Sequence, residues 1–212
     1  MIKAVIFDMD GVILDSESVC DKTWVAALAE EGFVDDKDAI NKCRGTNYAD
    51  TCNILHELYG SNFPAEKFMT RASELFHKVE KEQGIPLLPY AKETLEYLSA
   101  KYIVALASST REASVRRLLK DKDVLGYFKT LTTGDMVSHS KPDPEIYRLA
   151  CASIGLPPEV CVAVEDSPNG IKSAYAAGLK VVMVPDRIAP TKEIEKLCWQ
   201  ICPNLKELEK IL

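Results

Sequence analysis

Long apolar runs are missing from this chain of 212 residues, because none approaches the roughly 20 residues that a membrane-spanning helix needs. Clusters of basic residues are missing too: Lys and Arg never form runs longer than a pair, and the net charge is −6. We therefore expect neither nucleic acid nor an anionic membrane as a partner. The N-terminus lacks the layout of a secretory signal, and we expect a soluble, cytoplasmic monomer.

Cysteine patterns typical of disulfide frameworks and zinc sites are also absent. The seven cysteines are scattered, odd in number and never spaced as C-x-x-C. We predict that they are reduced thiols without a metal or disulfide role. What the chain does have is apolar content: 47% of its residues are hydrophobic, which is enough for one large or two modest domains.

Five short segments rich in Val, Ile, Leu and Ala are typical of buried parallel strands, and helical patterns lie between them. The predicted strands are 3–7, 103–107, 130–133, 161–164 and 180–184. The predicted helices are 91–100, 111–119, 144–153 and 168–177, with a helical tail from residue 191. This alternation predicts an α/β fold, a doubly wound parallel sheet with right-handed crossovers.

The spacing of the predicted strands is uneven, since about 100 residues separate the starts of the first two. Within this interval, residues 16–84 contain no strand-like run, and apolar residues such as Phe68, Ala72 and Leu75 recur at helical spacing. We predict a helical domain at 16–84 inserted into an α/β domain formed by 1–15 and 85–212. The insertion starts a few residues after Asp8 and Asp10, so it is expected to act as a lid over the end of the first strand.

Polar residues follow three of the predicted strands at the point where each strand ends. The clusters are Asp8 and Asp10, then Ser108-Ser109-Thr110, then Glu165-Asp166-Ser167. Ligands of open α/β sheets bind beyond the carboxyl ends of the strands, where the strand order reverses, so these clusters are expected to share one edge. Helix capping explains some of them equally well, because Ser and Thr are favoured N-caps, and Ser167-Pro168 and Asp143-Pro144 are good helix starts.

Capping does not account for Glu165 or for the pair of Asp8 and Asp10. With Asp166 these residues make four carboxylates at one edge, which would raise one another's pKa values. A bound divalent cation removes that difficulty, and hard oxygen ligands suit Mg²⁺. Lys141, otherwise an ordinary loop lysine, would add a further positive charge.

This combination suits phosphoryl transfer, because Mg²⁺ and Lys141 relieve the repulsion between a phosphate dianion and a carboxylate nucleophile. Asp8 as nucleophile would divide ester hydrolysis into two steps through an aspartyl-phosphate. Asp10 lies on the same face if the strand continues, and there it could protonate the departing alcohol and then take a proton from water. Ser108 and Ser109, with N–H groups at the following helix start, can hold phosphate oxygens.

At these residues the chain resembles the haloacid dehalogenase superfamily, specifically its β-phosphoglucomutase-like branch. FDMDGVILDSE looks like that family's first motif, ASST its second, KPDPEIY its third and VEDSPNGIKSAYAAG its fourth. The resemblance implies a Rossmann-like core with a mobile helical cap that excludes water. The roles it implies are a nucleophile at Asp8, an acid/base at Asp10, phosphate contacts at Ser108 and Lys141, and Mg²⁺ held by Asp8, the Asp10 carbonyl and Asp166, with Glu165 acting through a water.

The same motifs separate the chemistries within the family. Dehalogenase members lack the second aspartate and phosphonate-cleaving members carry a small residue there, so Asp10 argues against both. Similar sugar-phosphate mutases carry a histidine ten residues after the acid/base aspartate, where this chain has Cys20. We therefore predict Mg²⁺-dependent hydrolysis of a small phosphorylated metabolite such as a sugar phosphate. The alternatives are a sugar-phosphate mutase and a non-catalytic binding protein of the same fold.

The family places a specificity loop near NKCRGTNYAD, so Arg44, Gly45 and Thr46 are candidate substrate contacts. A solvated turn between helices explains these residues as well. Asp135 follows the third strand, where it either supports the loop or takes part in function. His139 lies in the loop before Lys141 and is expected to be solvated.

Overall fold

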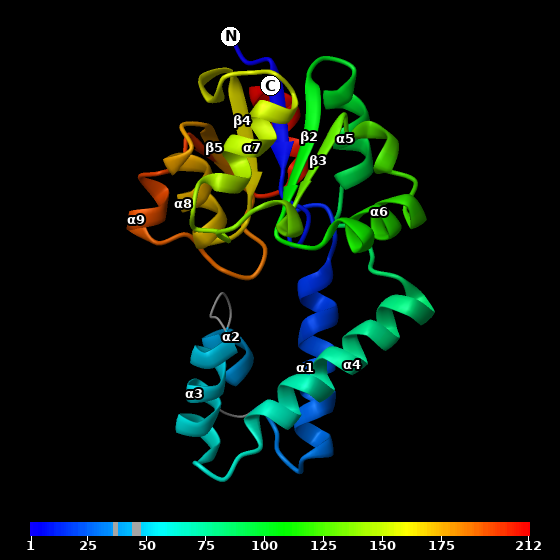
Figure 1. Ribbon diagram of the computed structural model, residues 1–212, viewed down its shortest axis with the longest axis vertical. Coiled ribbons are helices and arrows are strands. Elements are labelled where there is room, and N and C mark those ends of the chain that lie inside the picture. Colours follow the sequence, from blue (N-terminus) through cyan, green and yellow to red (C-terminus); the bar gives the residue numbers. More distant parts are fainter. Residues whose placement is uncertain (36–37, 44–47) are drawn as a thin grey trace. The chain divides into compact units, whose positions relative to one another are not determined.

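The computed structural model describes residues 1–35, 38–43 and 48–212, and the chain divides into two compact units. One unit is formed by Met1–Asp15 together with Pro86–Leu212, and the other by Ser16–Ile85 (Figure 1). Within the described ranges, no helix has both the length and the apolar character needed to cross a membrane.

The first unit is built on a six-stranded parallel sheet with the order β3-β2-β1-β4-β5-β6. Its strands are β1 (Ala4–Phe7), β2 (Ile103–Ser108), β3 (Thr130–Thr133), β4 (Cys161–Glu165), β5 (Lys180–Met183) and β6 (Gln200–Ile201). β1 lies between β2 and β4, with Phe7 opposite both Leu106 and Val164. The strand order therefore reverses beside β1, and the predicted doubly wound α/β fold is confirmed.

Helices pack against this sheet and bury its central strands, whereas both residues of β6 at the edge are exposed. They are α5 (Ala91–Ser99), α6 (Glu112–Asp121), α7 (Glu145–Ser153), α8 (Pro168–Ala176), α9 (Lys192–Glu195) and α10 (Leu208–Ile211). On one face, alternate strand residues such as Ile6 and Met183 form a core with Ile171 of α8 and with residues of α7 and α9. Figure 1 shows α7 and α8 in front of the strands. β1 is fully buried, which explains why its sequence is apolar at every position rather than at alternate ones.

The prediction of a helical tail from Thr191 is wrong in part. After α9 the chain forms the short strand β6, and α10 follows only at Leu208. The Trp199 N–H donates to Val181 O at 2.7 Å, and the Cys202 N–H donates to Met183 O at 2.8 Å. These bonds pair the segment with the edge of β5, and this long-range pairing outweighs the local helical pattern.

The second unit contains the helices α1 (Ser16–Glu30), α2 (Ala39–Cys43), α3 (Tyr48–Tyr59) and α4 (Ala65–Gln83). Its core includes Leu28, Leu55 and Phe68, all fully buried. The rings of Trp24 and Phe68 meet edge to face, with their centroids 5.1 Å apart. The apolar residues at helical spacing thus form a core of their own.

Candidate active site

Asp8 lies directly after β1, beside the point where the strand order reverses. Its N–H donates to Val164 O at 3.0 Å, which ties the backbone of Asp8 to β4. The residue is 7% exposed. Burial raises the pKa of the Asp8 carboxyl to about 7, because the opposing effect of Lys141 is outweighed by burial and by the neighbouring carboxylates of Glu165 and Asp10.

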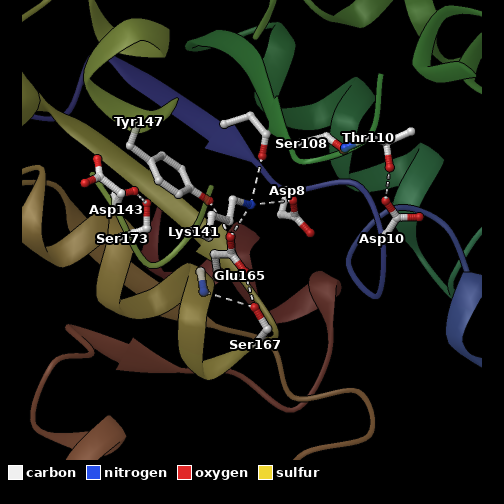
Figure 2. Close-up of polar contacts among 12 residues, drawn as sticks. Asp8, Asp10, Ser108, Thr110, Lys141, Asp143, Tyr147, Glu165, Ser167 and Ser173 are labelled. Carbon is white, nitrogen blue, oxygen red and sulfur yellow. Dashed lines mark hydrogen bonds and ion pairs between the residues drawn. The ribbon is translucent and has the colours of Figure 1, made fainter. Parts of the chain in front are cut away.

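Lys141 holds the Asp8 carboxylate from the loop before α7. Its Nζ donates to Asp8 Oδ1 at 2.7 Å, to Glu165 Oε1 at 2.7 Å and to Ala107 O at 3.1 Å (Figure 2). These contacts use the three N–H donors of the ammonium group. Burial alone would lower the pKa of Lys141, but the charges of Asp8 and Glu165 raise it above its ordinary value, so the ammonium stays charged.

Glu165 ends β4 and is fully buried. Its Oε1 accepts hydrogen bonds from Lys141 and, at 2.7 Å, from the hydroxyl of Tyr147, whereas its Oε2 accepts one from Ser167 Oγ at 3.2 Å. A Cβ atom on Gly170 would lie 2.0 Å from this carboxylate, so only glycine lets α8 approach it so closely. Both oxygens of Glu165 are therefore engaged by protein donors.

Three carboxylates gather at this edge of the sheet. Asp8, Glu165 and Asp166 each have an oxygen within 4.8 Å of the other two, so among the described residues they form a group that could hold a metal ion. Gly11 has a φ of +74° and makes room for this group, because a Cβ there would lie 2.3 Å from Asp166 Oδ2. The single ammonium of Lys141 offsets only one of the three negative charges.

Asp10 has a hydrogen-bond partner of its own at this end of the sheet. β1 ends at Phe7, so the strand geometry that would place Asp8 and Asp10 on one face does not continue. The Asp10 carboxylate instead accepts a hydrogen bond from Thr110 Oγ1 at 2.9 Å, beyond the end of β2 (Figure 2). The two aspartates therefore have different hydrogen-bond partners: Lys141 donates to Asp8, and Thr110 donates to Asp10.

Ser108 ends β2 and Ser109 follows it, but neither caps the next helix. α6 begins at Glu112, whose N–H donates to Asp135 Oδ1 at 3.1 Å, so Asp135 supplies the cap from the neighbouring loop. Ser108 is fully buried, and its Oγ accepts the Thr110 N–H at 3.1 Å, whereas Ser109 is exposed. Capping thus explains Asp135, and it leaves the two serines open to another role.

The remaining predicted residues fall into two groups. Arg44, Gly45 and Thr46 lie outside the described residues. His139 is exposed, and its Nδ1 lies 3.3 Å from Glu145 Oε2. The Glu145 carboxylate also accepts the N–H groups of Ser138 and His139, which holds the loop that leads to Lys141.

Comparison with known proteins identifies the family of this chain. A family model for haloacid dehalogenase-like hydrolases matches residues 2–178. The chain is a haloacid dehalogenase-like hydrolase. Over 183 residues it is 33% identical to the phosphorylated carbohydrates phosphatase of Thermotoga maritima, across 84% of this chain and 82% of that protein. The family and the hydrolase class predicted from the motifs are confirmed.

Two solved structures show how far the likeness extends. A Thermotoga maritima protein described as a candidate beta-phosphoglucomutase has 29% identity and a TM-score of 0.81, with all of both chains covered. CbbY from Rhodobacter sphaeroides in complex with phosphate has 26% identity and a TM-score of 0.73, over 98% of this chain and 96% of that one. These haloacid dehalogenase-like neighbours share the fold over almost the full chain.

Two residues that contact the predicted site were not assigned roles by the sequence analysis. Thr110 stands inside the ASST motif and binds Asp10, and Tyr147 ends the KPDPEIY motif and binds Glu165. A signal for Tyr147 exists in the sequence, because a phenol on an otherwise apolar helix face needs a buried partner. No comparable signal marks Thr110, since its contact joins residues 100 positions apart.

Proposed function

We propose that this hydrolase is a Mg²⁺-dependent phosphatase that cleaves phosphate monoesters of small metabolites, with sugar phosphates as its substrate class. The observation that carries the proposal is the buried Asp8 carboxylate with the Lys141 ammonium 2.7 Å away, where the strand order of the sheet reverses. The similarity to a phosphatase of phosphorylated carbohydrates and to a phosphate-bound neighbour supports the substrate class.

Asp8 is the proposed nucleophile. One of its carboxylate oxygens attacks phosphorus as the bond from phosphorus to the ester oxygen breaks, which yields an aspartyl-phosphate. Asp10, in its protonated form, gives a proton to the departing ester oxygen, so that an alcohol leaves and Asp10 becomes a carboxylate. Asp10 then takes a proton from the water that attacks the same phosphorus, and Asp8 and inorganic phosphate are released. The hydrogen bond from Thr110 holds the carboxyl group of Asp10 in place before the reaction.

Lys141 and Ser108 prepare the site for phosphate. Because its three N–H groups are used by protein acceptors, Lys141 orients Asp8 and offsets its charge before the substrate arrives. A direct contact between Lys141 and phosphate requires release of one of these donors. Ser108 Oγ accepts the Thr110 N–H and retains its own proton, which it can donate to a phosphate oxygen.

Asp8 and Asp166 are the proposed carboxylate ligands of Mg²⁺, together with the carbonyl of Asp10. The site suits this ion, because the carboxylate oxygens of Asp8, Glu165 and Asp166 are hard donors within 4.8 Å of one another and Lys141 leaves most of their charge uncompensated. Glu165 supports the site from behind the ligands, since both its oxygens already accept protein hydrogen bonds. The bound ion would stabilise negative charge on the phosphoryl oxygens.

Replacing Gly11 by alanine should impair the metal site. The new Cβ would displace Asp166 Oδ2, from which it would lie 2.3 Å away, and we expect phosphatase activity to fall at least about tenfold, as when the surroundings of a metal ligand are altered. Gly155→Ala is the matched control, because Gly155 has a φ of +69° and a Cβ added there would meet no atom within 4 Å. Both variants should lose about 1–2 kcal/mol of stability from the left-handed backbone.

Activity at a series of Mg²⁺ concentrations distinguishes the two glycine variants. Gly11→Ala should need more Mg²⁺ for half-maximal turnover, whereas Gly155→Ala should match the wild type. Equal behaviour of the two variants would mean that Asp166 does not need the space beside Gly11.

We further propose that the helical unit is the cap that selects the leaving group. The insertion leaves the α/β unit after Asp15 and returns at Pro86, and the Asp15 N–H donates to Pro86 O at 2.9 Å. Both connections therefore meet the α/β unit at one place, five residues after Asp10. A cap hinged there would exclude water and contact the part of the substrate that departs.

A sugar-phosphate mutase is the second candidate, favoured by the likeness to the candidate beta-phosphoglucomutase. Similar sugar-phosphate mutases carry a histidine at the position of Cys20 on α1, and its replacement by cysteine here favours hydrolysis. The deciding experiment incubates purified protein and Mg²⁺ with a panel of sugar phosphates and other phosphorylated metabolites, and measures released phosphate and isomerised sugar phosphate together. Phosphate release supports the phosphatase, isomerised product supports the mutase, and neither product refutes both.

A further inference from the structure

Tyr147 carries the one hydroxyl among the buried residues of α7. The residue is fully buried, and its hydroxyl donates to Glu165 Oε1 at 2.7 Å. We propose that Tyr147 is a positioning residue: it fixes the Glu165 carboxylate, and through it the Lys141 ammonium, against the Asp8 nucleophile. The inference rests on the proposed phosphatase function and adds a residue to its machinery.

The contacts form a continuous path from α7 to the nucleophile. Glu165 Oε1 receives two hydrogen bonds of equal length, one from Tyr147 and one from Lys141, each 2.7 Å long. Lys141 in turn donates to Asp8 Oδ1 at the same distance. Figure 2 shows the phenol and the ammonium approaching Glu165 together. Any rotation of the Glu165 carboxylate therefore moves an acceptor on which Lys141 depends.

Tyr147 also borders Lys141 directly. The Lys141 Nζ lies 5.2 Å from the centre of the Tyr147 ring, within the range of a cation–π contact. A change of Tyr147 to phenylalanine keeps the ring and this contact and removes only the hydroxyl. The variant therefore tests the hydrogen bond to Glu165 by itself.

The hydroxyl of Tyr147 remains protonated and therefore stays a hydrogen-bond donor. Burial, reinforced by the charges of Glu165 and Asp8, raises the pKa of Tyr147 well above its ordinary value, so the phenol keeps its proton. Hydrogen bonds from a neutral donor to a buried carboxylate are charge-assisted and strong. Without it, Glu165 keeps Lys141 on Oε1 and Ser167 on Oε2, and its carboxylate gains freedom to rotate.

The test compares Tyr147→Phe with Tyr175→Phe, which removes the same hydroxyl from an exposed position on α8. Steady-state hydrolysis of a generic aryl phosphate with saturating Mg²⁺ gives kcat and KM, and calorimetry gives the affinity for inorganic phosphate. We expect Tyr147→Phe to lower kcat about tenfold to a hundredfold, the usual effect of losing a partner that orients a site residue. KM and the affinity for phosphate should stay within about threefold of the wild-type values, because the three N–H donors of Lys141 already bind protein groups in the free enzyme. Tyr175→Phe should leave all three values unchanged.

A second comparison asks whether Tyr147 acts through Glu165. On a Glu165→Gln background the oriented charge is gone, so adding Tyr147→Phe should lower kcat by less than about threefold. Losses that multiply in full would overturn the inference, as would a wild-type kcat for Tyr147→Phe or a parallel loss of phosphate affinity. If Tyr147→Phe does not fold, Ser167→Ala frees the other oxygen of Glu165 and should also lower kcat without changing KM.

These outcomes separate the two proposals. An active wild type with an unimpaired Tyr147→Phe variant overturns the positioning role and leaves the phosphatase standing. A wild type that hydrolyses no phosphate ester overturns both, because a positioning role then has no reaction to serve.

Discussion

Replacing Asp8 by asparagine should abolish phosphate release, with a loss of about ten-thousandfold or more, the scale on which removal of a catalytic group acts. An amide cannot attack phosphorus to form the acyl phosphate. Glu165 is the other carboxylate that accepts a hydrogen bond from Lys141, and it is fully buried, so we expect that it cannot replace Asp8. Phosphate release from the substrate panel, followed at enzyme concentrations high enough to detect such a loss, measures the effect.

Asp8→Asn should leave the fold intact. Burial raises the pKa of Asp8, so the folded protein gains no stability from the ionised form, and a neutral side chain of the same shape is tolerated there. Asp121→Asn, on the exposed end of α6, is the matched control and should keep full activity. Circular dichroism and the unfolding midpoint should agree among all three proteins. Near-native turnover by Asp8→Asn would show that Asp8 is not the nucleophile.

Removal of divalent cations should have the second largest effect. Three carboxylates at the site face an approaching phosphate dianion, and Lys141 offsets only one of them. A bound divalent cation is worth several kcal/mol to such a reaction, so excess chelator should lower turnover at least about a thousandfold. Phosphate release before and after dialysis against the chelator measures this loss.

The identity of the cation can be tested in the same assay. Added Mg²⁺ should restore activity, whereas Ca²⁺ should restore much less, because it takes longer bonds and more ligands than a compact set of carboxylates offers. Chelator saturated with Mg²⁺ beforehand is the control for direct inhibition. Turnover that continues undiminished in excess chelator would exclude the proposed metal.

Much of the site follows from residues that are adjacent in the sequence. The central strands β1 and β4 contain continuous apolar runs because both faces of the sheet are covered there, and the polar residues begin where those runs end. Parallel strands bring their carboxyl ends to one edge, which is why Asp8, Glu165 and Asp166 could be expected together from the sequence. The same reasoning was less successful beyond Phe7, where the strand stops and Asp10 turns toward Thr110.

The C-terminal segment and the loop serines show a different limit. The pattern after Thr191 is compatible with a helix, and only the open edge of β5 makes a strand of Gln200–Ile201. Ser108 and Ser109 have the composition of a helix cap, yet Asp135 from another loop takes that role. In both cases a partner remote in sequence competes with a local preference and prevails.

By itself, the sequence determined the class of fold, the helical insertion and the acids at the strand ends, because each depends on local periodicity and on the geometry shared by all parallel sheets. Only the tertiary structure decided which donor meets which acceptor: Lys141 on Asp8, Tyr147 and Ser167 on Glu165, and Thr110 on Asp10. Apart from the contact between Ser167 and Glu165, which are two residues apart, those pairings join separate segments of the chain at distances of a few ångströms. Burial makes each of them matter, because an unpaired polar group there cannot turn to water.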